Sequence, residues 1–165
     1  MGGFLFSVQL MNSADLSQVG QIEDDAYQFP WPLQLFRECL QARYHAVVAV
    51  GEDQPSKVRG YALMTSHSDE AEILNLTVDS KFRSQGIGAQ LLQHMITQAR
   101  TDGARQLFLE VRESNASASR IYTRFFFKQV GRRIGYYQGS EDREDACTGI
   151  VCLYNYILGD RKSVV

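Results

Sequence analysis

The chain has 165 residues, of which 44% are hydrophobic and 22% are charged, and its formal net charge is −2. This composition is typical of a single globular domain and excludes a disordered chain, a collagen and a coiled coil. The slight negative charge also argues against direct binding to nucleic acid, because proteins that bind through phosphate contacts are usually basic.

The first half of the chain predicts strands and helices in alternation. Residues 4–10 are rich in β-forming side chains and predict a strand, and Asn12 or Ser13 can cap the helix that follows. Pro30 and Pro32 end that helix and start another. The expected elements are a helix through Leu16, Val19, Ile22 and Ala26, a helix at 33–42, strands at 45–50, 58–66 and 72–78, and turns at 51–56 and near 68–69.

The second half begins with a change of period. Apolar residues at helical spacing, with Gly103 just beyond them, predict a helix. These residues are Ile87, Leu91, Leu92, Met95, Ile96 and Ala99. A strand at 106–111, a helix capped by Ser114 or Asn115, and strands at 126–133 and 146–157 follow, with a polar, acidic loop at 135–145. Antiparallel strands first and strand–helix–strand units later indicate an α/β fold with an α+β mixed sheet.

Cysteine and histidine patterns indicate neither a disulfide framework nor a metal site. Cys39, Cys147 and Cys152 are odd in number and form no CxxC pair, and the histidines lack metal-ligand spacing. No run of 18 apolar residues is present, and the first residues lack the basic and apolar regions of a signal peptide. We therefore expect a cytoplasmic protein with reduced thiols, no metal and no membrane contact.

The most informative segment is the turn after the strand at 72–78. Arg83, Gly86 and Gly88 follow that strand, and the glycines open an amphipathic helix. N–H groups at a helix start carry partial positive charge, and glycine lets a phosphate approach the backbone. The segment is a candidate pyrophosphate site, although an ordinary strand–helix turn is the commoner explanation of a bare Gly-x-Gly. The patterns of Rossmann and Walker phosphate sites are both absent.

Two motifs extend this turn into a family pattern. Arg83-x-x-Gly86-x-Gly88, after a Val-Asp strand end, resembles the coenzyme A pyrophosphate motif of the GNAT superfamily of N-acetyltransferases. The run LEVRESNA at 109–116, with Tyr122 after it, resembles the second conserved half of that superfamily. The resemblance covers nearly the whole chain. It implies a GNAT-like acyl-CoA N-acyltransferase fold, with one domain over residues 4–158, a central, mostly antiparallel sheet and about four helices.

Four marks narrow the resemblance to the bacterial ribosomal-protein-alanine N-acetyltransferases. They are FPW at 29–31, LEVR-x-SNA from 109, the tyrosines at 136–137, and REDA at 143–146. One feature departs from the family, which has Leu-Gly-Phe where this chain has Phe125, Phe126 and Phe127. Without the glycine, that turn must use another backbone geometry or a shifted strand start, which affects local packing and not the chemistry.

The resemblance implies attack of an amine on an acetyl thioester, which needs a base and an acid. It places the general base at Glu110, although from the residues alone an acidic side chain in an apolar strand lies either at a cleft or on a solvated face. It places the proton donor at Tyr122, whose helical face by itself suggests a core position. A phenol of pKa about 10 stays protonated until a thiolate, of pKa about 8.5, develops.

The resemblance also implies the contacts to acetyl-CoA. The pantetheine arm would pair with the strand end, and the pyrophosphate with the glycine turn. Asn115 would bind the coenzyme, although a residue at this position can simply cap the helix. The expected contact residues are Leu76, Thr77, Val78, Arg83, Ser84, Gln85, Gly86, Ile87, Gly88, Ala89 and Asn115, with no metal.

As the substrate, the resemblance implies the N-terminal alanine of a small-subunit ribosomal protein. We expect Trp31, Tyr136 and Tyr137 to line the peptide groove, although each can simply pack. The acidic residues at 141–145 are either solvated or attract a basic peptide. The acidic stretch at 23–25 suggests a solvated helix face.

These expectations describe a monomeric transferase that moves acetyl from acetyl-CoA to a protein N-terminal amine, with no direct nucleic acid partner. An enzyme that acetylates a small amine or a lysine side chain is the alternative within the same fold. A non-catalytic acyl-CoA sensor is the alternative from another class. The presence of both Glu110 and Tyr122 argues against the sensor.

Overall fold

The computed structural model describes residues 5–137, 139 and 142–153. The described residues form two compact units. The first unit comprises the described residues within Met1–Thr65 and Leu74–Met95. The second comprises those within Ser66–Ile73 and Ile96–Val165. The fourth strand and the third α-helix contribute residues to both units.

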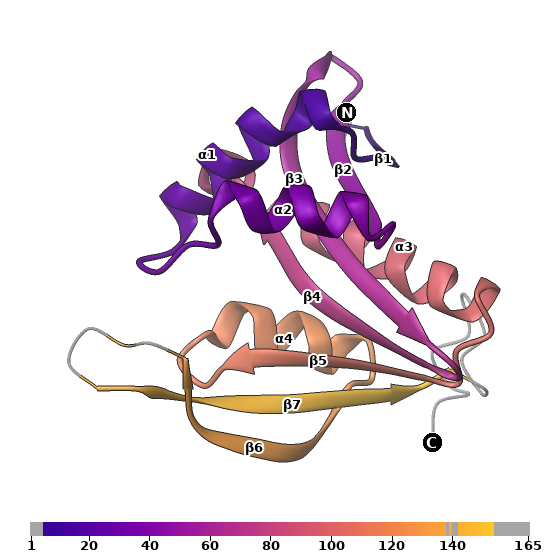
Figure 1. Ribbon diagram of the computed structural model, residues 1–165, viewed down its shortest axis with the longest axis vertical. Coiled ribbons are helices and arrows are strands. Elements are labelled where there is room, and N and C mark those ends of the chain that lie inside the picture. The colour runs from indigo at the N-terminus through magenta and orange to yellow at the C-terminus, as the bar shows by residue number, and fades with distance from the viewer. Residues whose placement is uncertain (1–4, 138, 140–141, 154–165) are drawn as a thin grey trace. The chain divides into compact units, whose positions relative to one another are not determined.

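Within the described residues lie four α-helices, two short 3₁₀ helices and seven strands (Figure 1). In chain order they are β1 (Phe6–Leu10), η1 (Ser13–Asp15), α1 (Leu16–Ala26), α2 (Leu33–Gln41), β2 (His45–Gly51), β3 (Gln54–His67), β4 (Glu70–Val78), η2 (Ser80–Phe82), α3 (Ile87–Thr101), β5 (Gln106–Arg112), α4 (Ala116–Arg124), β6 (Lys128–Tyr137) and β7 (Glu144–Cys152). The strands hydrogen-bond in the order β1-β2-β3-β4-β5-β7-β6. β4 and β5 are parallel, whereas β1–β2, β2–β3, β5–β7 and β6–β7 are antiparallel. The prediction of a mixed, mostly antiparallel α/β fold is confirmed.

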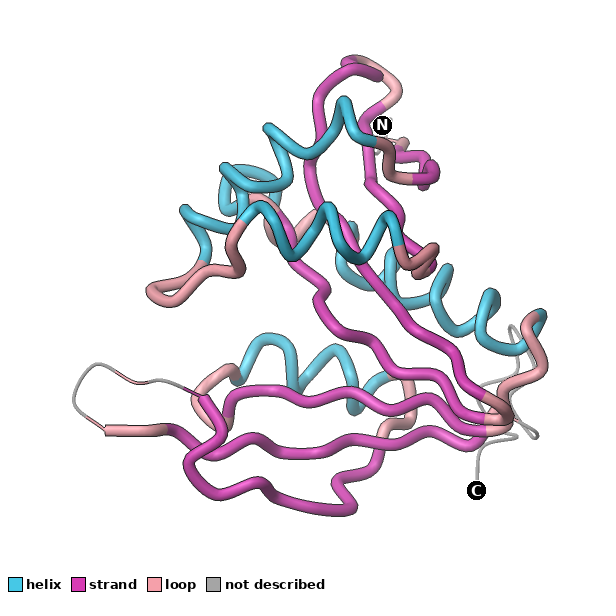
Figure 2. Tube along the Cα trace, viewed as in Figure 1, coloured by secondary structure: helices cyan, strands magenta, loops and turns pink. Residues whose placement is uncertain are grey.

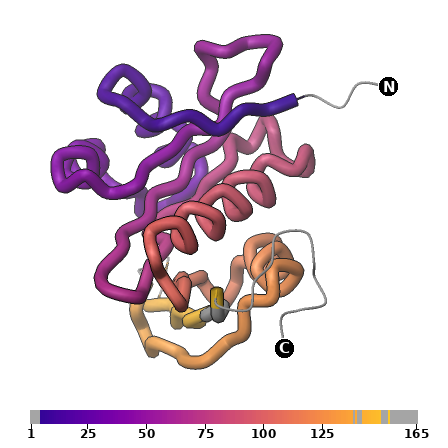
Figure 3. Tube along the Cα trace, turned by 90° about the vertical axis from the view of Figure 1, so that its right-hand side faces the viewer, coloured from indigo at the N-terminus to yellow at the C-terminus, as the bar shows by residue number. Residues whose placement is uncertain are grey.

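In the first unit, α1 and α2 cover one face of β2 and β3, and the start of α3 covers the other face (Figure 1; Figure 3). Phe36 of α2 and Tyr61 of β3 are fully buried in the core under α1 and α2. On the opposite face, a Cβ added to Gly60 would meet the carbonyl oxygen of Thr77 at 3.0 Å and the side chain of Ile87 at 3.2 Å. This close approach packs the start of α3 against β3, beside the end of β4.

In the second unit, the start of β4 pairs with β5 from Glu70 opposite Gln106 to Ile73 opposite Leu109. β7 pairs with β5, and β6 pairs with β7 as the edge strand (Figure 2). Leu109 is buried on one face of β5. Because side chains alternate along a strand, Glu110 belongs to the opposite face.

Several predicted boundaries are wrong. β3 begins at Gln54, so the predicted turn at 51–56 is shorter. β6 continues to Tyr137 and β7 begins at Glu144, so both ends of the predicted loop at 135–145 are strand. These stretches are exposed or half-buried and lack the apolar alternation from which a strand is predicted. The predicted strand ends at residues 4 and 157 lie outside the described residues.

The turn after α4 shows how the chain accommodates its missing glycine. Phe126 has a φ of +67°, in the left-handed region that glycine adopts without steric cost. The following strand begins at Lys128 and not at residue 126 as predicted. A side chain in this region costs about 1–2 kcal/mol. Phenylalanine therefore occupies, under strain, a conformation that favours glycine.

None of the helices in the described part of the chain is long and apolar enough to cross a membrane. Cys39 is buried, Cys147 is half-buried, and both are free thiols. The prediction of one domain over residues 4–158 stays a prediction.

Candidate functional site

The end of β4, in the first unit, carries the three residues predicted to pair with the pantetheine arm. Leu76 and Val78 are half-buried, and Thr77 is buried. The Thr77 hydroxyl forms hydrogen bonds of 2.7 Å with the side chains of Tyr27 and Asn75. The side chain of Thr77 is thus buried and hydrogen-bonded within the protein. This agrees with the expectation that Thr77 contacts a ligand through its backbone and not through its side chain.

The turn after β4 is anchored by Phe82. Asp79 accepts a hydrogen bond from the N–H of Lys81 at 3.0 Å and caps the short helix η2. The guanidinium of Arg59 lies 4.5 Å from the centre of the Phe82 ring, and Arg59 is 3% exposed and paired with Asp53 at 2.7 Å. This cation–π contact fixes the turn to the body of the first unit. Residues 59 and 82 are too far apart in the sequence for the contact to be predicted.

The glycine turn itself is open. Its members differ in exposure: Arg83, Ser84, Gln85 and Gly86 are exposed, Ala89 is half-buried, and Ile87 and Gly88 are buried. Gly86 has a φ of +87°, and a Cβ added to it would meet no atom within 4 Å. The N–H groups in the first turn of α3 have no acceptor within the helix. A turn with exposed backbone at a helix N-terminus, beside Arg83, fits a pyrophosphate group.

A buried polar cluster lies behind the end of β4. Its centre is Glu23, which is 1% exposed, so the prediction that it lies on a solvated helix face is wrong. Its carboxylate accepts hydrogen bonds from Asn75 Nδ2 at 2.7 Å and from the Tyr61 hydroxyl at 3.3 Å. Burial raises the pKa of Glu23, and these hydrogen bonds partly offset the rise. Its burial could have been predicted from the sequence, because Glu23 lies seven residues after Leu16 and therefore on the same face of α1, which is buried.

Trp31 packs on Phe36, with ring centres 5.3 Å apart, and borders the core of the first unit. It also lines a groove of about 930 Å³ formed by residues of α1, α2 and their connection, including Asp24 and Arg37. Trp31 thus packs against the core and lines the groove at the same time. Its contact with a peptide stays a prediction.

In the second unit, Glu110 of β5 forms an ion pair with Arg133 of β6. Arg133 Nε lies 2.8 Å from Glu110 Oε1, and the Glu110 side chain is 10% exposed. A carboxylate held in this way has a fixed orientation in which to accept a proton. The sequence did not reveal Arg133, because its pairing depends on β7 lying between β5 and β6.

Tyr122 lies on α4, on the other side of β5. Its ring contacts that of Phe127, with centres 5.7 Å apart. Phe127 lies on the same face of the sheet as Leu109. A Cβ added to Gly149 would meet the Leu109 side chain at 3.2 Å and the Phe127 side chain at 3.6 Å. Glu110 belongs to the opposite face. The residues predicted as acid and base thus belong to opposite faces of β5.

Asn115 is the cap of α4, and its Oδ1 accepts a hydrogen bond from the N–H of Ala118 at 3.1 Å. Its Nδ2 is a separate donor, so capping and coenzyme binding are compatible. The neighbouring Ser114 is not the cap; its N–H donates to Glu144 at 2.7 Å. This hydrogen bond and the ion pair with Arg112 hold the pKa of Glu144 below its usual range.

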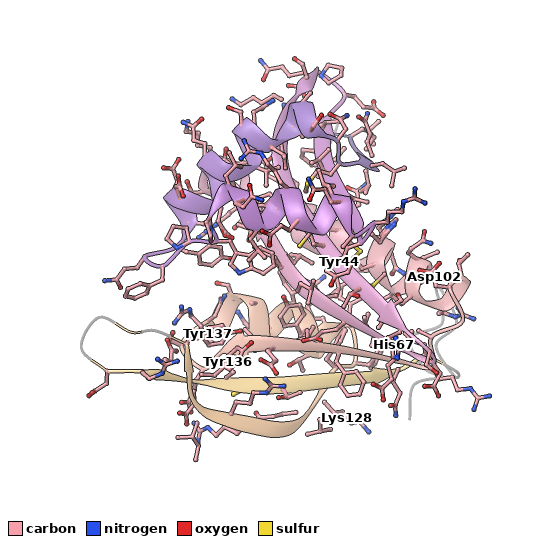
Figure 4. The ribbon with its side chains drawn as sticks, viewed as in Figure 1. Tyr44, His67, Asp102, Lys128, Tyr136 and Tyr137 are labelled. Carbon is pink, nitrogen blue, oxygen red and sulfur yellow. The ribbon has the colours of Figure 1, made fainter. Side chains whose placement is uncertain are left out.

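Tyr136 and Tyr137 lie next to each other at the end of β6 (Figure 4). Their rings meet edge to face with centres 4.9 Å apart. The guanidinium of Arg133 lies 5.1 Å from the centre of the Tyr136 ring, and that of Arg112 lies 4.4 Å from the centre of the Tyr137 ring. Tyr136 is 45% exposed. Its aromatic surface therefore adjoins the arginine that holds Glu110.

The acidic residues predicted to attract a basic peptide are partly engaged within the protein. Asp145 accepts a hydrogen bond from the N–H of Gly135 at 2.8 Å and pairs with Arg132 at 3.0 Å. Glu144 is engaged by Ser114, as described. Glu141 lies outside the described residues. This region offers less uncommitted negative charge than its sequence suggests.

Among the described residues, no group of three or more His, Cys, Asp or Glu side chains is arranged to hold a metal ion. His45 and His94 contact each other in the first unit, with their Nε2 atoms 2.9 Å apart. Burial lowers the pKa of His94. His67 is exposed.

Comparisons with known proteins bear on the same residues. The family model described as the acetyltransferase (GNAT) family matches residues 16–127. The [ribosomal protein bS18]-alanine N-acetyltransferase of Salmonella typhimurium is 33% identical over 140 residues, which are 85% of this chain and 93% of that protein. The crystal structure of the ribosomal-protein-S18-alanine N-acetyltransferase from Escherichia coli is 30% identical with a TM-score of 0.83, and the match covers 95% of this chain and 98% of that one. Arabidopsis thaliana NAA60 in complex with acetyl-CoA shares the fold, with a TM-score of 0.78 at 19% identity over 90% of this chain and 99% of that one.

Proposed function

The chain belongs to the GNAT acetyltransferase family, and we propose that it transfers the acetyl group of acetyl-CoA to the N-terminal α-amino group of a protein. The proposed acceptor is the α-amino group of the N-terminal alanine of ribosomal protein bS18. The observation that carries this proposal is the nearly buried Glu110 carboxylate, held by Arg133 at 2.8 Å. The relatives named for bS18 alanine, at 33% and 30% identity, support the choice of substrate.

In this proposal the first unit holds the coenzyme portion of acetyl-CoA. The exposed turn at 83–86 and the N-terminus of α3 offer backbone N–H groups and the Arg83 side chain to the pyrophosphate. The strand end at 76–78 offers backbone to the pantetheine arm. The family resemblance also assigns the amide of Asn115 a contact with the coenzyme. The proposal needs no metal.

The second unit supplies the acid and the base. The amine nitrogen forms a bond to the acetyl carbon, and the bond from that carbon to sulfur breaks. Glu110 accepts the proton that the nitrogen loses, and Tyr122 donates a proton to the departing thiolate. Exchange with solvent restores both groups, so the products are an N-acetylated peptide and free coenzyme A.

A terminal amine suits a carboxylate base better than a lysine does. With a pKa near 7.8, about a fifth of α-amino groups are neutral at about pH 7.2, whereas a lysine of pKa about 10.4 is neutral in well under about 0.1% of molecules. The terminal amine thus starts with an advantage of about 300-fold in its reactive form. Glu110 can serve it without a site that strongly lowers the pKa of a lysine.

Two peptides of the bS18 N-terminal sequence test the substrate. One has a free N-terminus, and the other is blocked there but rich in lysine. We expect acetylation of the free peptide alone, measured as coenzyme A release and as added mass. Glu110→Gln and Tyr122→Phe should each lower turnover by about 10²–10⁴-fold without changing acetyl-CoA binding. Equal or faster acetylation of the blocked peptide would instead assign a lysine or small-amine transferase.

A further inference from the structure

A second carboxylate, Glu72, lies beside Glu110 on the sheet of the second unit. Glu72 belongs to β4 and is opposite Phe108 of β5 in the parallel register. Glu110 is two residues farther along β5, and side chains two residues apart share a face. Diagonal neighbours on one face of a sheet lie close enough for long side chains to interact.

Arg133 completes a set of three charges on this face. Its Nε lies 2.8 Å from Glu110 Oε1. Burial and then the negative charge of Glu110 raise the pKa of Glu72, and the charge of Arg133 partly offsets that rise. Two carboxylates therefore share the field of one guanidinium, and a proton added to the pair relieves their mutual repulsion.

Other charged groups also belong to this face, among them Glu70 of β4 and Lys128 of β6. Arg112, also on this face of β5, pairs with Glu144 at 3.3 Å. Of the β7 residues on this face whose side chains are described, Ala146 and Thr148 do not titrate, and Glu144 is the partner of Arg112. Among the described residues of the four strands, Arg133 forms the ion pair with Glu110, and Glu72 is the carboxylate on the neighbouring strand whose protonation responds to both of them.

We propose that Glu72 is a positioning residue for the proton acceptor: it competes with Glu110 for Arg133 and so sets the pH below which the pair stops accepting the proton of the amine. A positive charge such as that of Arg133 favours the ionised form of a carboxylate beside it. The negative charge of Glu72 opposes this effect. The inference rests on the proposed role of Glu110 as base.

The pH dependence of kcat/KM with one free N-terminal peptide tests the inference. The ratio of variant to wild-type kcat/KM removes the titration of the peptide amine, which is common to both. For Glu72→Gln, which keeps the shape and removes the charge, this ratio should rise as pH falls from about 8 into the acid limb, towards a limit of about tenfold for a shift of roughly one pH unit. For Arg133→Gln, the ratio should fall over the same range.

Arg132→Gln is the matched control. Arg132 precedes Arg133 in β6, points to the opposite face and pairs with Glu113 and Asp145. Its ratio should stay constant with pH. Each variant is also checked for an unchanged rise in melting temperature with acetyl-CoA, which reports folding and the coenzyme site.

The outcomes separate this inference from the proposed function. If Glu110→Gln keeps wild-type turnover, the assignment of the base is wrong. If Glu110→Gln is inactive but the Glu72→Gln ratio is constant or falls at low pH, the base is right and the role of Glu72 is wrong. A Glu72→Gln ratio that rises at low pH, with the opposite trend for Arg133→Gln, supports the inference.

Discussion

Gly86 offers a sharp test of the coenzyme site, because Gly103 at the other end of α3 is a matched control. The two glycines have φ values of +87° and +89°, and at neither would an added Cβ meet an atom within 4 Å. Replacement by alanine therefore imposes similar backbone strain, about 1–2 kcal/mol, without a clash. A chain of this size loses about 2–4 °C per kcal/mol. Each variant should thus melt about 2–8 °C below the wild type.

Only Gly86→Ala should weaken the response to acetyl-CoA. At a concentration of about 100 Kd, a ligand that binds the native state stabilises it by about 2.7 kcal/mol, which corresponds to about 5–11 °C here. The methyl group added to Gly86 would occupy the open space above the turn, where the pyrophosphate is expected. A tenfold loss of affinity would remove about 1.4 kcal/mol, half of that stabilisation. Gly103→Ala should keep the full shift.

Thermal melting of the wild type and both variants, with and without acetyl-CoA, measures both effects. The melting temperatures without ligand compare the backbone strain at the two glycines. Equal ligand-induced shifts in the two variants would refute the placement of the pyrophosphate at Gly86. A much larger loss of intrinsic stability in only one variant would refute the assumption of equal strain.

Two further predictions concern stability. The pKa of Glu23 is raised in the folded protein, so the native state binds this proton more tightly than the unfolded chain does. Proton binding by Glu23 therefore stabilises the fold below about pH 4.5, and this contribution is lost as pH rises through the pKa of Glu23 in the folded protein. The melting temperature of Glu23→Gln should therefore gain on that of the wild type between about pH 4 and 8, and a constant difference would contradict this. At Phe126, where φ is +67°, Phe126→Gly should be more stable than Phe126→Ala by about 1 kcal/mol in urea unfolding; the reverse order would show that the left-handed conformation relaxes.

The sequence predicted elements whose side chains alternate between core and solvent. The helix Ile87–Thr101 was visible because one of its faces is continuously apolar. The ends of the long strands β3 and β6 were not, because exposed strands held by backbone hydrogen bonds carry no such pattern. Glu23 shows the opposite error, since two acidic neighbours hid a residue that lies on the buried face of its helix.

The candidate site was predictable where it is local in sequence. The glycine turn and the cap at Asn115 each lie within a few consecutive residues, so a motif can represent them. The charges of Glu72, Glu110 and Arg133 come from three strands, and Glu72 and Arg133 are 61 positions apart in the numbering. Only the register of β4 against β5, and the position of β7 between β5 and β6, brings them onto one face.

A bulge in β6 breaks the simple alternation of that strand. Gln129 lies opposite Gly149 of β7, and Gly131 lies opposite Thr148. Val130 is therefore an extra residue between two successive pairs, which is the definition of a β-bulge. Odd-numbered residues before and after Val130 therefore point to opposite faces of the sheet, and the same holds for even-numbered residues.

This bulge decides which of two adjacent arginines reaches Glu110. Arg133 lies opposite Ala146, on the Glu110 face of the sheet, and Arg132 lies on the other face. In an unbroken ladder continued from residue 129, Arg132 would lie opposite Ala146 instead, because a shift of one residue exchanges the two faces. The ion pair at the proposed base thus depends on one extra residue in an exposed edge strand, and assigning faces by alternation from the start of β6 selects the wrong arginine.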